Sequence, residues 1–172
     1  MDWTIEPVPP HHPDAGTILR RYFTDIASRY LGRPVTDAEL AAALAAEPSD
    51  DLVSPTGLLL VARQAGHPVG CAGVRLLEPD VAELTRVFTE PGLRGRGLGG
   101  TLVLAAEEAA RSLGARLVRL DTRHDLVEAR RLYVRLGYRE IDAYHDGPYA
   151  DHWFEKALTG EPRPPARRRT WC

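Results

Sequence analysis

The sequence predicts an α/β (α+β) protein with a mixed, mostly antiparallel sheet of about seven strands and helices on both faces. Three strand-like segments follow one another, separated only by short turns, as in an antiparallel meander: residues 58–63, 69–77 and 81–89. The apolar period then changes to that of a helix over 97–113, and an apolar strand-like segment follows at 116–122. Because antiparallel strands lead into a helix and a further strand, the sheet is expected to be mixed.

The segment before this meander is expected to hold one strand and two helices. Residues 3–8 alternate weakly between apolar and polar side chains, which indicates a first strand. Asp14 is expected to cap a helix that runs to about Tyr30. Thr36 and Glu39 fit a capping box, which opens a short Ala/Leu helix that ends at Ala46.

The segment after the meander supplies the rest of the sheet. Residues 127–136 are expected to form a helix that Gly137 ends. Tyr138–Tyr144 and His152–Leu158 are expected to form a closing pair of strands. The predicted domain therefore spans residues 1–158, and the Pro- and Arg-rich tail 159–172 is expected to be disordered.

Charge and composition exclude several classes of protein. The formal net charge is −2, and the tail holds four Arg and one Glu, so residues 1–158 carry about −2 − 3 = −5. An acidic body argues against nucleic-acid binding. No apolar run approaches the roughly 20 residues that span a bilayer. The N-terminus also lacks a signal-peptide pattern, so no membrane partner and a cytoplasmic location are expected. The two cysteines lack metal-site spacing, and no metal is expected.

A glycine-rich segment between a strand end and a helix start carries the chemistry. Residues 90–101 read Glu-Pro-Gly-Leu-Arg-Gly-Arg-Gly-Leu-Gly-Gly-Thr. Glycines at such a turn let the backbone approach an anion, and the free N–H groups of the helix start attract phosphate. The segment therefore predicts a phosphate-binding turn.

The same glycines also match a dinucleotide fingerprint, because Gly95, Gly97 and Gly100 have its spacing and Asp121 lies about twenty residues on. The context argues against that interpretation. Five residues separate the fingerprint from its strand, and too little chain follows Asp121 for further βαβ crossovers. A P-loop is excluded because no Gly-Lys-Ser/Thr follows.

Two motifs together resemble the GNAT superfamily of N-acetyltransferases. Residues 94–99, Arg-Gly-Arg-Gly-Leu-Gly, match the Arg/Gln-x-x-Gly-x-Gly/Ala signature of that family. Residues 129–138 resemble its second signature, Ala-x-x-Leu-Tyr-x-x-x-Gly-Phe/Tyr, and residues 83–89 resemble its fourth strand. The resemblance implies a GNAT-like fold, acetyl-CoA as cosubstrate and transfer of its acetyl group to an amine.

The resemblance also implies which residues hold acetyl-CoA. The backbone of Gly95 to Gly100, including Gly97, Leu98 and Gly99, is expected to hold the pyrophosphate, and Arg94 and Arg96 are expected to add positive charge. The exposed edge of the fourth strand, Val87, Phe88 and Thr89, is expected to pair with the pantetheine arm. Many relatives carry an Asn at the position of Leu126, so that contact is missing here or is replaced by Asp125 or Thr122.

Two residues are expected to be catalytic. Tyr133 resembles the general acid that protonates the departing thiolate; the alternative is a packing role in its helix. Glu83 lies six residues before Thr89, where some relatives carry their catalytic base; the alternative is a surface carboxylate or an ion pair with Arg86. His145, His152 and Asp146 are other candidates for the base.

The acceptor is expected to lie near the first two helices and the loop 144–149. Tyr144, His145 and Tyr149 of that loop, together with Glu83, suit a cationic amine. Arg86 is expected either to bind a substrate carboxylate or to pair with a neighbour. The sequence thus predicts an acetyl-CoA-dependent N-acetyltransferase of a small primary amine, in which the amine attacks the thioester directly. A protein or peptide acetyltransferase and a non-enzymatic coenzyme-A-binding regulatory module are the alternatives, and a homodimer is left open.

Overall fold

The structure is a computed structural model that describes residues 2–159. The tail 160–172, and with it most of the segment expected to be disordered, lies outside the described residues. The elements in chain order are β1 (Thr4–Pro7), α1 (Pro13–Leu31), α2 (Asp37–Ala46), β2 (Gly57–Gln64), β3 (His67–Glu78), β4 (Val81–Thr89), the 3-10 turn η1 (Pro91–Leu93), α3 (Leu98–Ser112), β5 (Leu117–Thr122), α4 (Val127–Arg135), β6 (Arg139–Ile141) and β7 (His152–Ala157).

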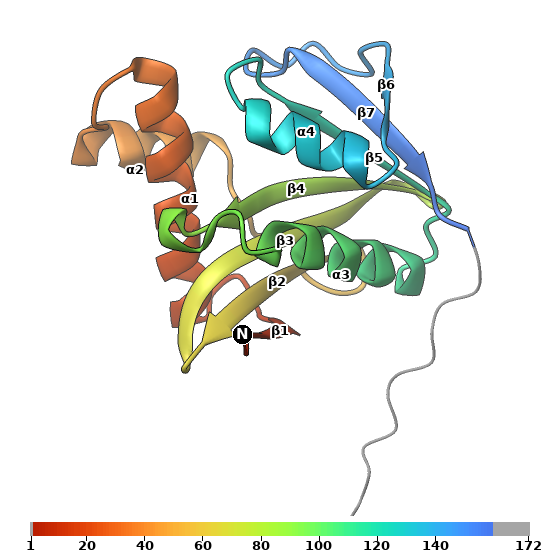
Figure 1. Cartoon of the computed structure of the whole chain (residues 1–172), viewed down its shortest axis with the longest axis horizontal. Helices are drawn as coiled ribbons and strands as arrows, with labels where there is room; N and C mark the ends of the chain where they lie inside the picture. Colours follow the sequence, from red (N-terminus) through yellow and green to blue (C-terminus); the bar gives the residue numbers. More distant parts are fainter. Residues whose placement is uncertain (1, 160–172) are drawn as a thin grey trace, which may run out of the picture.

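The described strands form one seven-stranded sheet in the order β1-β2-β3-β4-β5-β7-β6 (Figure 1). Among these strands only β4 and β5 pair in parallel, and every other neighbouring pair is antiparallel. The mixed, mostly antiparallel sheet predicted from the sequence is therefore confirmed. A dinucleotide-binding domain, which needs a mainly parallel sheet, is excluded by the same topology.

Helices cover both faces of the sheet. Alternate strand residues point to opposite sides, and apolar side chains on each side are buried in a separate core cluster. On one face α3 packs over β2, β3 and β4 with a core that includes Leu98, Leu102 and Val103. On the other face α1 packs with Ile18 and Leu19 against Val61, Cys71 and Phe88. Within the described residues no helix combines the length and the apolar character that a membrane crossing requires.

Two local predictions are corrected. The first helix is capped by His12, whose Nδ1 accepts a hydrogen bond from the Asp14 N–H, because Pro13 occupies the first helical position and the helix therefore begins before Asp14. The strand expected at Tyr138–Tyr144 is shorter in the structure. Only Arg139–Ile141 form a strand, β6, and these three residues pair with β7. The last residues of the expected strand leave the sheet because Tyr144 and His145 bond to groups on β4 and β5. The predicted capping box of Thr36 and Glu39 at the start of α2 is confirmed.

Candidate functional site

The sheet opens where β4 and β5 separate. Their parallel pairing covers only Val81 to Glu83 on β4, while β4 continues to Thr89. Beyond Glu83 one edge of β4 is therefore without a neighbouring strand. A cleft of about 1850 Å³ lies at this opening, and residues of α1, α2, β4, the glycine-rich turn, β5, α4 and the loop 145–150 line it. The split between β4 and the β5–β7 part of the sheet is visible in Figure 1.

The glycine-rich turn forms one end of the cleft. Gly95 and Gly97 have φ angles of +77° and +91°, which L side chains rarely adopt, and Gly97 is the residue that precedes α3. A Cβ at either position would meet nothing within 4 Å, so these glycines are required by backbone conformation and leave open space beside the turn. The first N–H groups of α3 lack intrahelical acceptors and lie next to this space.

The glycines at the start of α3 lie next to α4. A Cβ at Gly99 would lie 3.4 Å from the Leu132 side chain and one at Gly100 would lie 3.8 Å from it, and both distances are ordinary van der Waals contacts. Gly95, Gly97, Gly99 and Gly100 all line the cleft.

Other residues expected to hold a cosubstrate divide into two groups. Val87, Phe88 and Thr89 line the cleft along the free edge of β4, as does Leu126 at the start of α4. Leu98 is fully buried in the core, so only its backbone adjoins the site. Arg96 is exposed and does not line the cleft.

Arg94 and the two proposed substitutes for the missing Asn also have defined places. Arg94 lines the cleft and is held by an ion pair with Asp25 at 3.0 Å and a hydrogen bond to the Thr89 carbonyl at 3.1 Å. Thr122 lines the cleft, whereas Asp125 is bound to Arg123 at 2.9 Å. Thr122 is thus the better placed of the two to replace the Asn.

Tyr133 projects from α4 into the wall of the cleft. Its side chain is 6% exposed and packs against Tyr138 and Phe154. Its hydroxyl has no hydrogen-bond partner among the described residues, yet it is not one of their fully buried polar atoms. Burial raises the pKa of Tyr133, with smaller contributions from Tyr22 and Asp121. The group is therefore a protonated hydroxyl whose hydrogen-bonding capacity is directed to the cleft.

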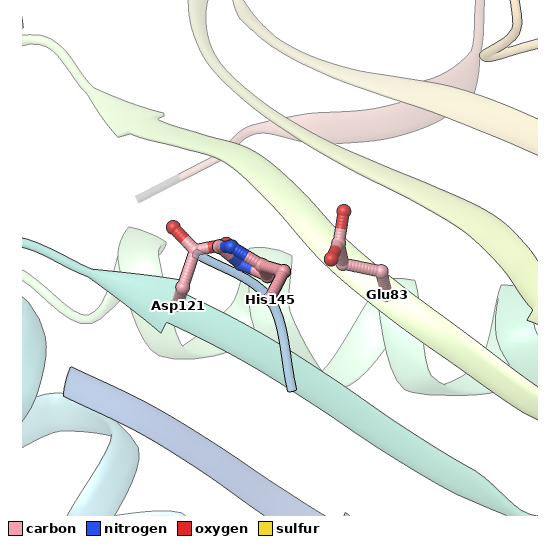
Figure 2. A group of neighbouring side chains, drawn as sticks. All are labelled: Glu83, Asp121 and His145. Atoms are coloured by element: carbon pink, nitrogen blue, oxygen red, sulfur yellow. The ribbon is translucent and has the colours of Figure 1, made fainter. Parts of the chain in front are cut away.

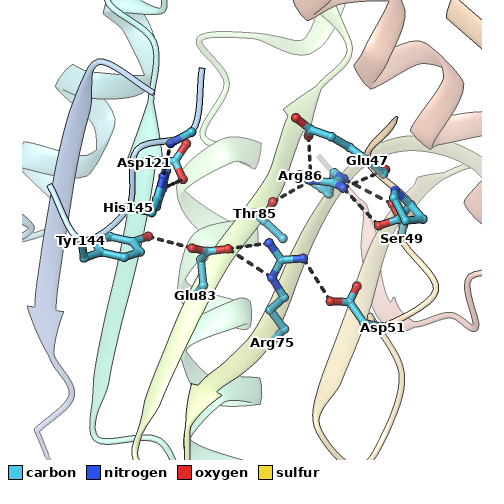
Figure 3. Close-up of polar contacts among 12 residues, drawn as sticks. Glu47, Ser49, Asp51, Arg75, Glu83, Thr85, Arg86, Asp121, Tyr144 and His145 are labelled. Carbon is cyan, nitrogen blue, oxygen red and sulfur yellow. Dashed lines mark hydrogen bonds and ion pairs between the residues drawn. The ribbon is translucent and has the colours of Figure 1, made fainter. Parts of the chain in front are cut away.

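Glu83 lies in a chain of polar contacts at the other end of the cleft (Figure 3). Its Oε1 accepts two hydrogen bonds from Arg75, at 2.7 and 3.1 Å, and its Oε2 accepts one from the Tyr144 hydroxyl at 2.8 Å. Arg75 also pairs with Asp51. The ion pair expected with Arg86 is thus made with Arg75 instead. Tyr144 donates to Glu83 but does not itself line the cleft.

Asp121 and His145 lie beside Glu83, although only His145 was singled out as a site residue in the sequence. Asp121 is near the end of β5, and its Oδ2 is 2.8 Å from Nε2 of His145. One ligand atom from each of Glu83, Asp121 and His145 lies within 4.8 Å of the others (Figure 2). Burial, and to a lesser extent the charge of Glu83, raises the pKa of Asp121 against the lowering effect of His145.

The spacing of these three groups could suit a metal ion, but their bonds argue for another use. Both oxygens of Glu83 already accept hydrogen bonds, and its charge is balanced by Arg75. Both ring nitrogens of His145 also have partners, Asp121 on one side and the Gly147 N–H on the other. A metal would have to displace most of these contacts.

Arg86 anchors the segment between α2 and β2. It has a φ of +55° at a register irregularity between β3 and β4, and it is 5% exposed. Its guanidinium donates to Ser49, to the Thr85 hydroxyl and to the Glu47 carbonyl, as drawn in Figure 3. Of the two roles expected for Arg86, pairing with neighbours is therefore the one that the structure displays, although its side chain also reaches the cleft.

The remaining candidates lie at the rim or away from the cleft. Tyr149 is 52% exposed and packs edge to face on Tyr30 of α1, with ring centroids 5.3 Å apart. His152 is bound to Glu140 at 2.6 Å and does not line the cleft, and neither does the exposed Asp146. Their positions do not favour either as the base.

Comparison with known proteins assigns the chain to a family. Residues 18–138 match the model of the acetyltransferase (GNAT) family, which is more than half of the chain. The chain therefore belongs to the GNAT family of acetyltransferases, as its two motifs predicted.

A curated relative supports this assignment. The uncharacterized N-acetyltransferase YjgM of Escherichia coli (strain K12) is 39% identical over 85 residues, 48% of this chain and 51% of that protein. The chain spans about half the length of the curated relatives it matches.

The solved structures share the fold. An acetyltransferase from Streptococcus agalactiae 2603 is similar with a TM-score of 0.73 and 19% identity, over 91% of this chain and 98% of that one. The PaiA N-acetyltransferase from Thermoplasma acidophilum, solved in complex with coenzyme A, gives a TM-score of 0.73 and 19% identity over 92% and 100%.

Proposed function

We propose that this protein is an acetyl-CoA-dependent N-acetyltransferase that acetylates a small primary amine by direct attack on the thioester. The observation that carries the proposal is the continuous cleft. It joins a turn suited to phosphate at one end to a group of carboxylates at the other, with the free Tyr133 hydroxyl on its wall.

The residues at the turn fit acetyl-CoA. Gly95 and Gly97 leave open space beside the N-terminus of α3, where N–H groups and the helix dipole favour a pyrophosphate. The unpaired edge of β4 at Val87 to Thr89 offers backbone groups to the amides of the pantetheine arm. When bound, acetyl-CoA supplies an activated acetyl thioester.

Side chains along the cleft would perform the proton transfers. Tyr133 is proposed to donate its hydroxyl proton to the leaving sulfur. With ordinary pKa values for a phenol and a thiol this transfer is uphill by about 2 kcal/mol, and the raised pKa of Tyr133 makes it more so. A hydrogen bond formed as the sulfur gains charge offsets this cost. Glu83, with Asp121 beside it, supplies the negative charge that attracts the ammonium form of the amine.

Contacts across the cleft favour a small molecule over a protein acceptor. Arg29 of α1 forms an ion pair with Glu128 of α4. Tyr30, next in α1, packs on Tyr149 of the loop 145–150. These contacts join α1, on one wall of the cleft, to α4 and the loop 145–150 on the opposite wall. Such bridges are expected of a pocket and not of an open groove that admits a peptide. The small-molecule acceptor and the use of acetyl-CoA as cosubstrate are both parts of this proposal.

Ligand-dependent melting tests the proposal directly. At 100 times its Kd, coenzyme A or acetyl-CoA should stabilise the fold by about 2.7 kcal/mol and raise Tm, whereas NADH should have no comparable effect. Release of free thiol from acetyl-CoA in a screen of primary amines should then identify an acceptor. A shift in Tm with NADH and none with coenzyme A would refute the proposal. Acetylation of peptides but of no small amine would favour the protein acetyltransferase.

A further inference from the structure

Two carboxylates that lie close together at the acceptor end differ in how their charge is balanced. The charge of Glu83 is paired with the Arg75 guanidinium, which reaches it through two hydrogen bonds. Asp121 has His145 as its only ion-pair partner among the described residues, and that pair carries a positive charge only if the imidazole is protonated. The negative charge of Asp121 is therefore less neutralised by its neighbours than that of Glu83, and it is available to a cationic substrate.

The hydrogen bonds of His145 determine its tautomer. Nδ1 is 3.0 Å from the Gly147 backbone nitrogen, which can only donate, so Nδ1 is the acceptor. The proton of the neutral ring is therefore on Nε2, where it is donated to Asp121 over 2.8 Å. Trp153 Nε1 also lies 3.3 Å from Nε2, but a second donor cannot use a nitrogen that already carries a proton, so we assign the shorter contact as the bond. His145 thus has no free basic nitrogen.

The place of Gly147 supports this arrangement. A Cβ at Gly147 would lie 3.0 Å from Nδ1 and 3.2 Å from Cε1 of His145. Only a glycine lets the backbone approach the imidazole so closely without displacing it. The turn Gly147-Pro148 therefore fixes the ring with Nε2 directed at Asp121.

Asp121 lines the same cleft as Tyr133, the group proposed to protonate the leaving sulfur. The negative charge of Asp121 contributes to raising the pKa of Tyr133 on α4 and of Tyr22 on α1.

We propose that Asp121 binds the substrate ammonium group and accepts its proton, and that His145 is a positioning residue that holds the Asp121 carboxylate. This inference rests on the proposed acetyltransferase activity and names its base. A carboxylate oxygen of Glu83 and one of Asp121 lie within 4.8 Å of each other, a separation that an ammonium nitrogen can bridge with one hydrogen bond to each. Glu83 then helps to hold the cation, and Asp121 takes the proton.

The protons balance in this scheme. The ammonium nitrogen gives one proton to Asp121 and becomes a neutral amine whose lone pair forms the C–N bond as the C–S bond breaks. A second proton leaves that nitrogen and replaces the one that Tyr133 gives to the sulfur. The products are the N-acetylated amine and free thiol, and Asp121 returns its proton to water.

The remaining wall indicates which amine to use as a probe. The α1–α2 side of the cleft is mainly apolar and aromatic: Tyr22, Phe23, Ile26, Val35, Ala42 and Ala46. A primary ammonium on an aromatic body complements both this wall and the carboxylates. 2-Phenylethylamine is such a probe, and 2-phenylethanol is its uncharged analogue.

Binding of the probe to Asp121→Asn in the presence of coenzyme A tests the proposal without catalysis. The amide keeps the size of Asp121 and an oxygen for the His145 Nε2–H, but it lacks the charge. We expect calorimetry at pH 7 to show at least a tenfold weaker Kd for 2-phenylethylamine and an unchanged Kd for 2-phenylethanol. Asp142→Asn removes a charge from an exposed position outside the cleft and should change neither. Equal affinity of wild type and Asp121→Asn, or no binding by wild type, would overturn the proposal.

The pH profile distinguishes a base from a binding group. Because the pKa of Asp121 is raised, wild-type kcat/KM should fall as the pH decreases through that pKa and the carboxylate is protonated. In Asp121→Asn, kcat/KM at pH 7 should be about 10²–10⁴-fold lower and should rise with pH toward the pKa of the amine, because only neutral amine reacts. The charged and titratable groups around Asp121 that could shape the profile are Glu83, Arg75, His145, Tyr144, Tyr133 and Tyr22.

Two variants of His145 separate positioning from catalysis. In His145→Gln the side-chain amide nitrogen can replace Nε2 as donor to Asp121 but cannot titrate, so activity should stay within about tenfold of wild type with an unchanged pH profile. His145→Ala removes the donor and should lose more. A loss in His145→Gln as large as in His145→Ala would show that the imidazole itself is the base and would refute the assignment.

Failure of this inference is distinguishable from failure of the proposed function. If coenzyme A raises Tm and thiol release is observed, but Asp121→Asn behaves as wild type, only the role of Asp121 is refuted. The variant should fold, because burial of an ionised carboxylate with a raised pKa costs stability at neutral pH, and the amide avoids this cost. The rise in Tm with coenzyme A confirms folding in each variant.

Discussion

The two ends of the cleft are built on different physical principles. At the glycine-rich turn the backbone forms the site, and the residues between Gly95 and Gly100 are contiguous in the chain. At the acceptor end the side chains form it, and Glu83, Asp121 and His145 come from two strands and a loop. A backbone site is determined by a local conformation, whereas a side-chain site depends on how distant segments meet. The first should therefore tolerate little local change, and the second should fail gradually as single side chains are altered.

The largest effect on cosubstrate binding is expected for Gly97→Val. A β-branched residue at a φ of +91° is strained, and relief of that strain would turn the N–H groups at the start of α3 away from the cleft. We expect the affinity for coenzyme A, measured by calorimetry, to fall at least about a hundredfold, a change of about 3 kcal/mol. Gly92→Val is the matched control, because Gly92 has open space, no positive φ and no part in the cleft. An unchanged Kd in Gly97→Val would remove the turn as the phosphate site.

Tyr133→Phe should affect the rate of acetyl transfer and not the binding of the cosubstrate. The ring is kept, so packing and the KM for acetyl-CoA should change little. Loss of the general acid should lower kcat about 10²–10⁴-fold, or about 3–5 kcal/mol, in single-turnover measurements. Tyr138→Phe removes a hydroxyl that is fully buried and without a partner, and it should leave kcat unchanged. A single-turnover rate in Tyr133→Phe equal to wild type would assign Tyr133 to packing alone.

Glu83→Gln should have a smaller effect than either. The amide can still accept the hydrogen bond of Tyr144, and the lost charge leaves Arg75 with Asp51 as its partner. The KM for the amine should rise about tenfold, in line with one charged hydrogen bond of roughly 1.5–3 kcal/mol, while the shape of the pH profile stays that of wild type. If the acid limb disappears in Glu83→Gln but persists in Asp121→Asn, the proton acceptor is Glu83, as its spacing from Thr89 first indicated.

The two ends also differ in how much of them the sequence could predict. The glycine spacing, the helix that follows and the order of strands were predictable because turn chemistry and periodicity are local. Asp121 was not recognised as a site residue because at the end of an apolar strand it resembles any strand-ending acid. Its role depends on His145, 24 residues later in the chain. The Glu83–Arg75 pair likewise depends on register, which places these residues directly opposite each other on β4 and β3.

The capping box at the start of α2 was also predicted from the sequence, and a change there should give the smallest effect. Glu39 closes the capping box of α2 by accepting the Thr36 N–H at 2.9 Å, and it also binds Arg33. These contacts, with the Arg33 bond largest, lower the pKa of Glu39 to about 2. A carboxylate with a lowered pKa contributes stability above its unfolded pKa of about 4.5 and loses it as the pH falls toward 2.

Glu39→Gln should therefore lower Tm slightly at pH 7 and flatten the decrease of Tm between about pH 4.5 and 2, because the amide has no charge to lose. Asp37→Asn is the matched control: it removes an acidic charge from the same first turn of α2, so it reports the helix-dipole effect alone. Glu39 also lines the cleft, but it lies on α2, whereas Glu83 lies on β4. The affinity for coenzyme A should stay unchanged in both variants. A loss of coenzyme A affinity in Glu39→Gln that exceeds the loss in Asp37→Asn would mean that the two ends of the cleft are coupled through α2, and the division between a backbone site and a side-chain site would no longer hold.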